Sequence, residues 1–268
     1  MTSELAQTIL DKFVQRHSAF AIQTDKGAYR PSAVYQCPHC PTKSQWATCR
    51  QHGGGENELI GYVPLDAARV QKHIDAEATY GHYIVDTDNT CRVLGFDIDL
   101  VKEVERGGVT INPRDIFFDK SHPLQGEIKE RFTQVIHGLM ERSRRISESQ
   151  VVATFSGNKG FHVYVLMPEP TVAGQVRALG HQILEGAFEA TRGDNFFKHT
   201  GWGTTSYDEI EIEMFPKQDT VGSDGFGNLM RLPLGTHQKS GRSGFFLDPT
   251  FPNASIKPAD PLAVLAGK

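Results

Sequence analysis

The sequence predicts an α+β fold in which strands come as neighbouring antiparallel pairs with helices between them. Residues 82–86 and 91–99 read as strands around Thr87-Asp88-Asn89, and residues 150–155 and 161–167 as strands around the loop 156–160. Short connections of turn-forming residues favour antiparallel pairs over a doubly wound parallel sheet. The chain has 268 residues, of which 38% are hydrophobic, so we predict one domain over residues 1–268.

Hydrophobic periodicity places the other elements. Apolar residues recur at helical spacing within residues 3–17, where Thr2 or Ser3 is the expected N-cap. Further helices are predicted over residues 66–78, 126–146 and 171–191. Strands are predicted at 19–24, 32–36, 59–65, 209–214 and 227–235, and the tail after Phe251 is expected to wrap the surface.

The bulk composition limits the class of protein. A formal net charge of −4 argues against a protein that coats nucleic acid without selectivity, but it leaves room for an enzyme with a local basic groove. No apolar run approaches the roughly 18 residues of a membrane span, and the N-terminus has no signal-peptide pattern. We therefore expect a cytoplasmic protein with no membrane partner.

Two aspartates at the end of an apolar segment form the first candidate site. Asp97 and Asp99 follow Val93-Leu94-Gly95-Phe96 and are separated by one residue. Alternate residues of a strand point to the same side, so both carboxylates converge. Like charges at that distance favour a cation between them, and oxygen-only ligands suit Mg²⁺ or Mn²⁺. A solvated strand end is the simpler interpretation of an isolated Asp-x-Asp, so the pair needs support from other motifs.

The loop from Ser156 to Gly160 is the second candidate. Its two glycines let the backbone approach a ligand, and Lys159 adds a positive charge. His162, at the start of the next strand, can donate to the same anion, so the loop suits phosphate oxygens. An ordinary polar hairpin turn is the alternative, and the order GxxxxGK[ST] of a Walker A loop is missing.

An acidic strand followed by cations is the third candidate. Glu211 and Glu213 share one strand face with Glu209, and a solvent-facing stripe would explain one or two of the three. An acid here would complete a metal site, while the cations that follow would offset phosphate charge. Polar candidates in the following block are Lys217, Asn228, Arg231 and His237.

A cysteine cluster in residues 36–55 predicts a small zinc-binding insertion. Cys37, Cys40, Cys49 and His52 have the spacing Cys-x2-Cys-x8-Cys-x2-His, which can close a tetrahedron around a structural Zn²⁺. His39 is an alternative fourth ligand. Independent buried thiols are the competing interpretation, but the polar residues around these cysteines disfavour it.

Together these blocks resemble the archaeo-eukaryotic primase superfamily, and within it the primase-polymerase domains of mobile elements and of CRISPR-associated or conflict systems. The segments IGYVPL, CRVLGFDID, SGNKGFH and FPKQDTVGSDGFGNLMRLPLG match in that order, from Leu59 to Gly235. The departure is Val63, which separates Tyr62 from Pro64 in the first segment.

The resemblance implies a fold and a set of site residues. The core would be an RRM-like antiparallel sheet with flanking helices, joined to an N-terminal α/β unit. Two catalytic Mg²⁺ or Mn²⁺ ions would be held by Asp97, Asp99 and Glu213, with Glu211 as the alternative third acid. The nucleotide would meet Ser156, Asn158, Lys159 and His162, with Lys217, Asn228, Arg231 and His237 near it, and His162 would also serve the catalytic step.

The implied activity is template-directed nucleotidyl transfer, in which a DNA primase-polymerase makes or extends primers from NTP or dNTP. Its partners would be a single-stranded DNA template, a primer or initiating nucleotide, and helicase, replication or CRISPR components. Two alternatives remain open: a catalytically silent nucleic-acid-binding replication module and a metal-dependent nuclease. Phe161 or Phe226 would be candidates to stack on a base.

Overall fold

The computed structural model confirms a mixed α/β fold built from antiparallel sheets. The described residues are 2–37, 43–45, 58–101, 104–106, 109–189, 197–199, 204–207, 210–222, 225–248 and 256–267.

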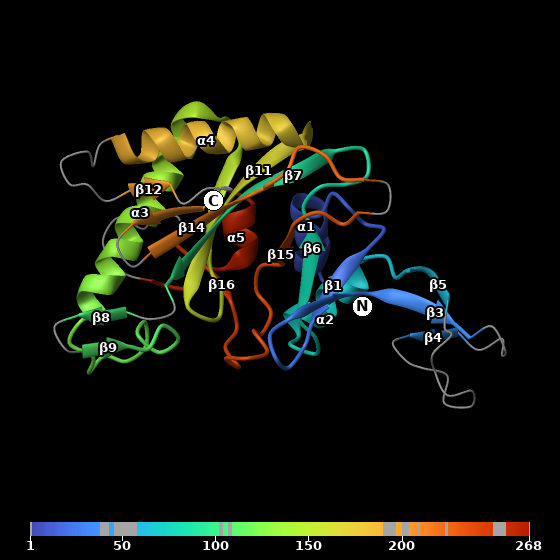
Figure 1. Cartoon of the computed structure of the whole chain (residues 1–268), viewed down its shortest axis with the longest axis horizontal. Coiled ribbons are helices and arrows are strands. Elements are labelled where there is room, and N and C mark those ends of the chain that lie inside the picture. The colour runs from blue at the N-terminus through green and yellow to red at the C-terminus, as the bar shows by residue number, and fades with distance from the viewer. Residues whose placement is uncertain are drawn as a thin grey trace.

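A seven-stranded sheet forms the larger half of the molecule (Figure 1), and its strand order is β12-β13-β14-β7-β11-β10-β16. The central strand β7 (Thr90–Leu100) pairs with β11 (Gly160–Val172) on one side and with β14 (Ile210–Phe215) on the other. The remaining strands are β10 (Gln150–Phe155), β12 (Phe197–His199), β13 (Thr204–Tyr207) and β16 (Phe245–Phe246).

A four-stranded sheet of order β15-β6-β1-β2 lies beside it. Its strands are β1 (Phe20–Gln23), β2 (Tyr29–Pro31), β6 (Tyr80–Tyr83) and β15 (Leu229–Arg231). The fourth strand therefore comes from the last quarter of the chain. Two smaller sheets are formed by β3 (Ala33–Gln36), β4 (Lys43–Gln45) and β5 (Glu58–Tyr62), and by β8 (Val104–Arg106) and β9 (Val109–Ile111).

Helices α3 (Gln125–Ile146) and α4 (Ala173–Glu189) cover one face of the large sheet. The sheet face that these helices cover carries apolar residues of β7 such as Leu94 and Phe96, both fully buried. Gly180 of α4 sits so close to this face that a Cβ would lie 2.3 Å from the sulfur of Met214. Because Asp97 and Asp99 alternate with these residues, they point to the opposite face, away from the two helices.

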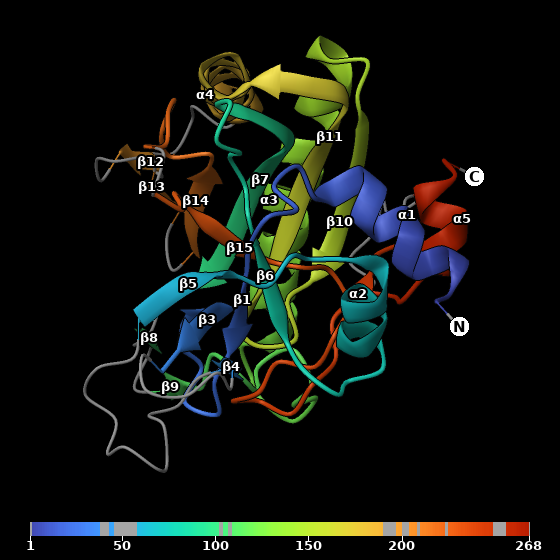
Figure 2. The same ribbon diagram turned by 90° about the vertical axis from the view of Figure 1, so that its right-hand side faces the viewer.

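The other helices lie on the side of the N-terminal unit (Figure 2): α1 (Glu4–Phe13), α2 (Ala67–Ile74) and α5 (Pro261–Leu265). Ser3 caps α1 by accepting from the backbone N–H of Ala6 at 3.2 Å. The Phe13 ring meets Tyr164 of β11 edge to face, with centroids 5.1 Å apart. Helix α1 therefore packs against the large sheet.

A glycine lets the two sheets approach one another. Gly95 of β7 lies under Met230 of β15, and a Cβ there would be 2.3 Å from the Met230 sulfur. Gly95 is two residues from Asp97 on the same face of the strand. The sheet junction therefore lies directly beside the acidic pair.

His73 fixes the segment that follows β15. The ring is fully buried, with Nε2 at 3.2 and 3.1 Å from the carbonyl oxygens of Leu232 and Pro233, while Nδ1 accepts from Tyr80 N–H at 3.0 Å. Gly235 has φ +56°, and a Cβ on it would clash with the His73 ring at 2.3 Å. The LPLG motif therefore has a structural role in this fold.

Most predicted elements are confirmed, with shifts at their ends. The pairing expected between the strands on either side of residues 87–89 is wrong: β6 belongs to the four-stranded sheet and β7 to the seven-stranded sheet, because each finds its partners in distant segments of the chain. The last helix expected from residue 171 begins at Ala173 because β11 runs on to Val172, and the helix expected over 66–78 ends at Ile74. The suggestion that Phe161 stacks on a base is wrong: the ring is fully buried and packs 5.5 Å from Phe132 of α3. Among the described helices, none combines the length and apolarity that a bilayer span requires.

Candidate functional site

Strand register brings the predicted acids onto one face of the large sheet. Asp97 lies directly opposite Glu213 of β14, and Asp99 lies opposite Glu211. Directly opposed residues of an antiparallel pair project to the same side, so all four carboxylates share the face opposite α3 and α4. On the other side of β7, Asp97 is opposite His162 and Asp99 is opposite Gly160.

A basic side chain from a neighbouring position accompanies three of these acids. His162 Nε2 lies 3.3 Å from Asp97 Oδ1, Lys159 Nζ lies 2.7 Å from Asp99 Oδ2, and Lys217 Nζ lies 3.1 Å from Glu213 Oε2. Within the described ranges, no three acidic, histidine or cysteine side chains converge around one point as a metal cage. The four acids share a face, and Asp97, Asp99 and Glu213 each lie against a different basic side chain.

Burial and mutual repulsion act on the two aspartates in opposite ways. Burial favours the neutral acid at Asp97, but the ion pair with His162, followed by Lys159 and Arg231, outweighs it and holds the pKa below its usual range. Burial, then the charge of Asp97, raises the pKa of Asp99 to about 7, although Lys159 opposes the change. Burial and repulsion from Asp97 therefore disfavour a second negative charge at Asp99, and a divalent cation between the carboxylates would relieve both effects.

This arrangement predicts a pH dependence for the metal-free protein. The pKa of Asp99 rises from 3.8 to about 7 on folding, so between these values the folded chain binds a proton that the unfolded chain has lost. The contribution of Asp99 to stability is therefore present at low pH and is lost as the pH rises through about 7. In EDTA, the melting temperature should fall more for the wild type than for Asp99→Asn between about pH 5 and about pH 8. Equal slopes would contradict the raised pKa.

The loop between β10 and β11 needs its two glycines. Gly157 has φ +77°, and a Cβ there would meet the carbonyl oxygen of Arg242 at 2.6 Å. Gly160 faces Asp99, and a Cβ would lie 2.3 Å from Asp99 Oδ1. The glycines thus bring the loop against the acidic pair, and Ser156 and Asn158 line the adjoining pocket.

Arg231 is the principal positive charge of the opposite wall. Its side chain is 7% exposed, and Nη1 is buried with no hydrogen-bond partner among the described residues. A buried cation with an unused donor is costly unless an anion binds there. Burial lowers the pKa of the arginine, and nearby Tyr29, Tyr164 and Asp97 raise it. A guanidinium remains charged in proteins at neutral pH.

His237 lies beside Arg231 as a neutral donor. Burial, then the charge of Arg231, lowers the pKa of His237 to about 4, so the ring is neutral at pH 7. Nδ1 accepts from the Ser240 N–H at 3.3 Å, so the hydrogen of the neutral ring resides on Nε2. His237 therefore offers a hydrogen-bond donor that carries no charge.

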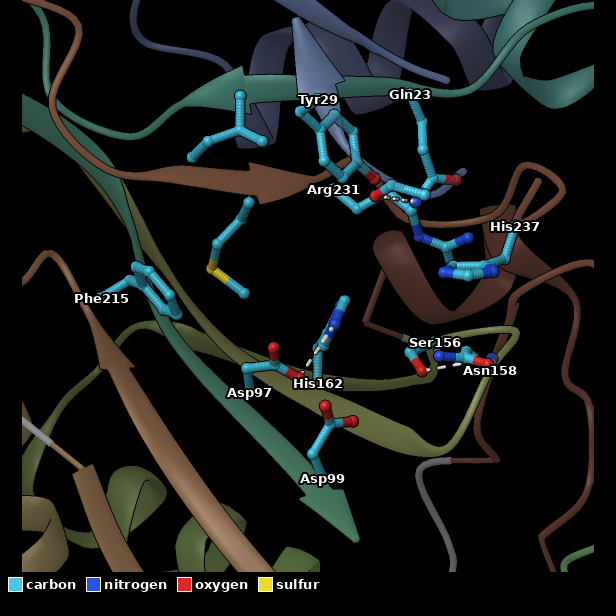
Figure 3. Close-up of a pocket in the computed structure, with 13 residues that line it drawn as sticks. Gln23, Tyr29, Asp97, Asp99, Ser156, Asn158, His162, Phe215, Arg231 and His237 are labelled. Carbon is cyan, nitrogen blue, oxygen red and sulfur yellow. Dashed lines mark hydrogen bonds and ion pairs between the residues drawn. The ribbon is translucent and has the colours of Figure 1, made fainter. Parts of the chain in front are cut away.

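One pocket of about 260 Å³ joins these groups. Figure 3 shows Asp97, Asp99 and His162 on its floor and Arg231 with His237 on the opposite wall. Ser156 and Asn158 close the end near His237, whereas Phe215 lies at the other end. The pocket is lined by Gln23, Gly27, Tyr29, Asp97, Asp99, Ser156, Asn158, His162, Phe215, Leu229, Met230, Arg231 and His237.

A family model decides which proteins this arrangement belongs with. The model described as the Archaeo-Eukaryotic Primase domain of the TOTE conflict system matches residues 6–262. The chain belongs to this primase family. The resemblance drawn from the sequence motifs is thereby confirmed.

Two solved structures match the chain at low sequence identity. The polymerase domain of Mycobacterium tuberculosis ligase D, solved in complex with DNA, is 13% identical, with 97% of this chain and 78% of that chain covered and a TM-score of 0.40. The archaeo-eukaryotic primase domain of the cyanophage S-2L primase-polymerase is 12% identical, with 98% and 94% covered and a TM-score of 0.34. No curated protein matches the chain.

The predicted site residues of the primase domain fall into two groups, those that line the pocket and those that do not. Asp97, Asp99, Ser156, Asn158, His162, Arg231 and His237 line the pocket, whereas Glu211, Glu213, Lys159, Lys217 and Asn228 do not. The Asn228 side chain accepts from the Lys217 backbone N–H at 2.9 Å, so it braces the end of β14. Of the predicted zinc ligands, Cys37 is described and buried, while Cys40, Cys49 and His52 lie outside the described residues, as does His39.

The sequence motifs did not predict the part of the pocket that β1 and β2 of the four-stranded sheet supply. Gln23 and Tyr29 reach the pocket from neighbouring strands, where they are directly opposed. Both stand in short segments with no metal-like or phosphate-like spacing. A buried glutamine in the otherwise apolar strand Phe20–Gln23 was the available signal.

Proposed function

We propose that this primase domain is a template-directed nucleotidyltransferase that makes or extends nucleic-acid primers from NTP or dNTP. One observation carries the proposal: Asp97 and Asp99 face the buried guanidinium of Arg231 across a single pocket. A metal-bound triphosphate needs acids at one end for the cations and donors at the other for the phosphates. Family membership is consistent with this chemistry.

The acids fit Mg²⁺ or Mn²⁺ ligation. The candidate ligands offer only carboxylate oxygens, which hard divalent cations prefer. Burial and then the charge of Asp97 raise the pKa of Asp99, and a bound divalent cation would favour its ionised form. Asp97, Asp99 and Glu213 would hold two ions, with Glu211 as the alternative third acid. Such ions activate an attacking 3′-hydroxyl and stabilise the leaving pyrophosphate.

The protein side chains would bind and orient the triphosphate. Arg231 supplies the charged donor, His237 Nε2–H a neutral donor, and Ser156 and Asn158 the polar end of the pocket. Lys159, His162 and Lys217 already accompany the acids and are placed to offset phosphate charge there. The Tyr164 hydroxyl lies 2.7 Å from His162 Nδ1, which holds the ring with Nε2 toward Asp97.

A structural zinc ion is proposed for the insertion at residues 36–55. Cys37 is buried at the end of the segment that leads into it, and Cys40, Cys49 and His52 complete a four-ligand spacing. Four protein ligands would close the coordination shell, so this ion would stabilise the fold and take no part in the chemistry. Metal analysis of reduced protein should find zinc bound stoichiometrically, and zinc-free folded protein would refute the proposal.

The proposed partners are a single-stranded DNA template and a primer or initiating nucleotide, with helicase, replication or CRISPR components as further candidates. We propose that residues 1–268 act as one catalytic domain in the cytoplasm. Incubation with single-stranded template, labelled nucleotides and Mg²⁺ or Mn²⁺ separates the possible functions. New products support the polymerase, a shortened template indicates a nuclease, and binding without reaction indicates a silent module.

A further inference from the structure

Tyr29 has a hydroxyl group that the free protein leaves unused. The residue lies on β2, the edge strand of the four-stranded sheet, and its side chain reaches the pocket (Figure 3). The hydroxyl oxygen is buried, and it has no hydrogen-bond partner within the described part of the chain. A buried hydroxyl without a partner costs stability, so its presence calls for a ligand that completes it.

The hydroxyl interacts with a charged group of each sign in the pocket. Its strongest electrostatic neighbours are Arg231, on the wall that faces the floor, and Asp97, on the floor itself. Burial raises the pKa of the Tyr29 phenol above its usual value, although Arg231 opposes the change. The group therefore stays protonated at neutral pH and is a donor for an incoming acceptor atom.

Strand register explains how Tyr29 comes to face the same space as Arg231. Arg231 is opposite Gly81 of β6, Gly81 is opposite Ala21 of β1, and Tyr29 is opposite Gln23. Ala21 and Gln23 are two residues apart on β1 and share one face, so these pairings across the four strands place Tyr29 and Arg231 on that same face. The side chains reach the pocket from sequence positions about two hundred residues apart.

We propose that the Tyr29 hydroxyl donates a hydrogen bond to a phosphate oxygen of the bound nucleoside triphosphate. The inference rests on the proposed function, and it adds strand β2 of the four-stranded sheet to the elements that bind the nucleotide. A triphosphate that runs from ions on Asp97 and Asp99 to the guanidinium of Arg231 would pass the hydroxyl. Phosphate oxygens accept strongly from such donors, and the contact forms only when nucleotide is bound.

The test replaces Tyr29 by phenylalanine, which removes only the oxygen. Without nucleotide, the melting temperature of Tyr29→Phe should equal or exceed that of the wild type, because no hydrogen bond is lost. Affinity for nucleoside triphosphates, titrated with Mn²⁺ and no template, should fall by about 10- to 100-fold, the range for hydrogen bonds to charged groups. The fall should be the same for each NTP and its dNTP.

Tyr80→Phe is the matched control. It removes a hydroxyl from the same sheet on the face that packs against α2, because Tyr80 is opposite Ile22 and not Ala21. Nucleotide affinity should be unchanged in this variant. The control tells two effects apart: a general effect of removing any tyrosine hydroxyl in this sheet, and the loss of a specific contact inside the pocket.

Other outcomes would overturn the inference in recognisable ways. Unchanged triphosphate affinity in Tyr29→Phe, while the wild type binds, would remove Tyr29 from the site and leave the proposed function intact. A loss confined to ribonucleotides would assign the hydroxyl to the sugar. A lower melting temperature without nucleotide would show a partner inside the free protein. Failure of the wild type to bind any triphosphate would overturn the proposed function and the inference with it.

Discussion

Replacement of both Asp97 and Asp99 by asparagine is expected to reduce nucleotide incorporation by at least about 1,000-fold, which in practice abolishes it. Asparagine keeps the shape of each side chain but removes the charge that would hold the cations. The fold should survive, because the pair lies at the floor of an open pocket outside the apolar core and its two charges repel one another in the metal-free protein. Circular dichroism and the melting temperature in EDTA would verify this.

The measurement is primer synthesis or extension on single-stranded template with Mg²⁺ or Mn²⁺. Asp219→Asn is a suitable control because Asp219 is also paired, with Arg177 at 2.7 Å, but lies outside the pocket. Wild-type activity is expected for the control. Substantial synthesis by the double variant would show that the acids do not carry the reaction, and the proposed function would then be wrong.

Glu213→Gln is expected to reduce synthesis by about 100-fold or more, whereas Glu211→Gln should change it by no more than a few-fold. Both glutamates stand on β14 and share a face with the aspartates. Glu213 is directly opposite Asp97, and its charge contributes to the raised pKa of Asp99. Glu211 is exposed. The two variants make the same chemical change two residues apart, so each serves as the control for the other.

The apparent affinity for Mn²⁺ should follow the same order. Loss of a ligand weakens metal binding, so raising the Mn²⁺ concentration should partly restore Glu213→Gln but have little effect on Glu211→Gln. The reverse ranking would assign the third ligand to Glu211. Equal, small effects would mean that two aspartates alone hold the ions.

The motifs predicted the floor of the pocket well because its chemistry is local. An alternating strand places Asp97 and Asp99 on one side whatever the rest of the fold does, and a loop with two glycines lies beside them. Glu213 was favoured among neighbouring acids, but only strand register could place it opposite Asp97. Register depends on pairing between distant segments, which periodicity does not encode.

The opposite wall could be predicted only in part. Arg231 and His237 carried a phosphate-like signal in the sequence, whereas Tyr29 became a site residue only when β2 took its place at a sheet edge. The role proposed for Tyr29 depends on the burial of its hydroxyl oxygen without a hydrogen-bond partner in the described part of the chain. Such burial follows from the whole fold and is not visible in the local sequence. The phosphate contact indicated for Lys159 stays a prediction, and the fold adds a pairing with Asp99 at 2.7 Å that the sequence did not indicate.

The position of β15 has a consequence for how the protein unfolds. The four-stranded sheet takes three strands from the first third of the chain and its fourth from residues Leu229–Arg231, between β14 and β16 of the large sheet. A fragment that lacked residues 1–83 would leave β15 without its only partner strand in the described fold, and Met230 would lose the sheet that presses it onto Gly95. The two halves are therefore interlocked by chain path and should melt in one cooperative transition, so a ligand in the pocket between them would stabilise both at once.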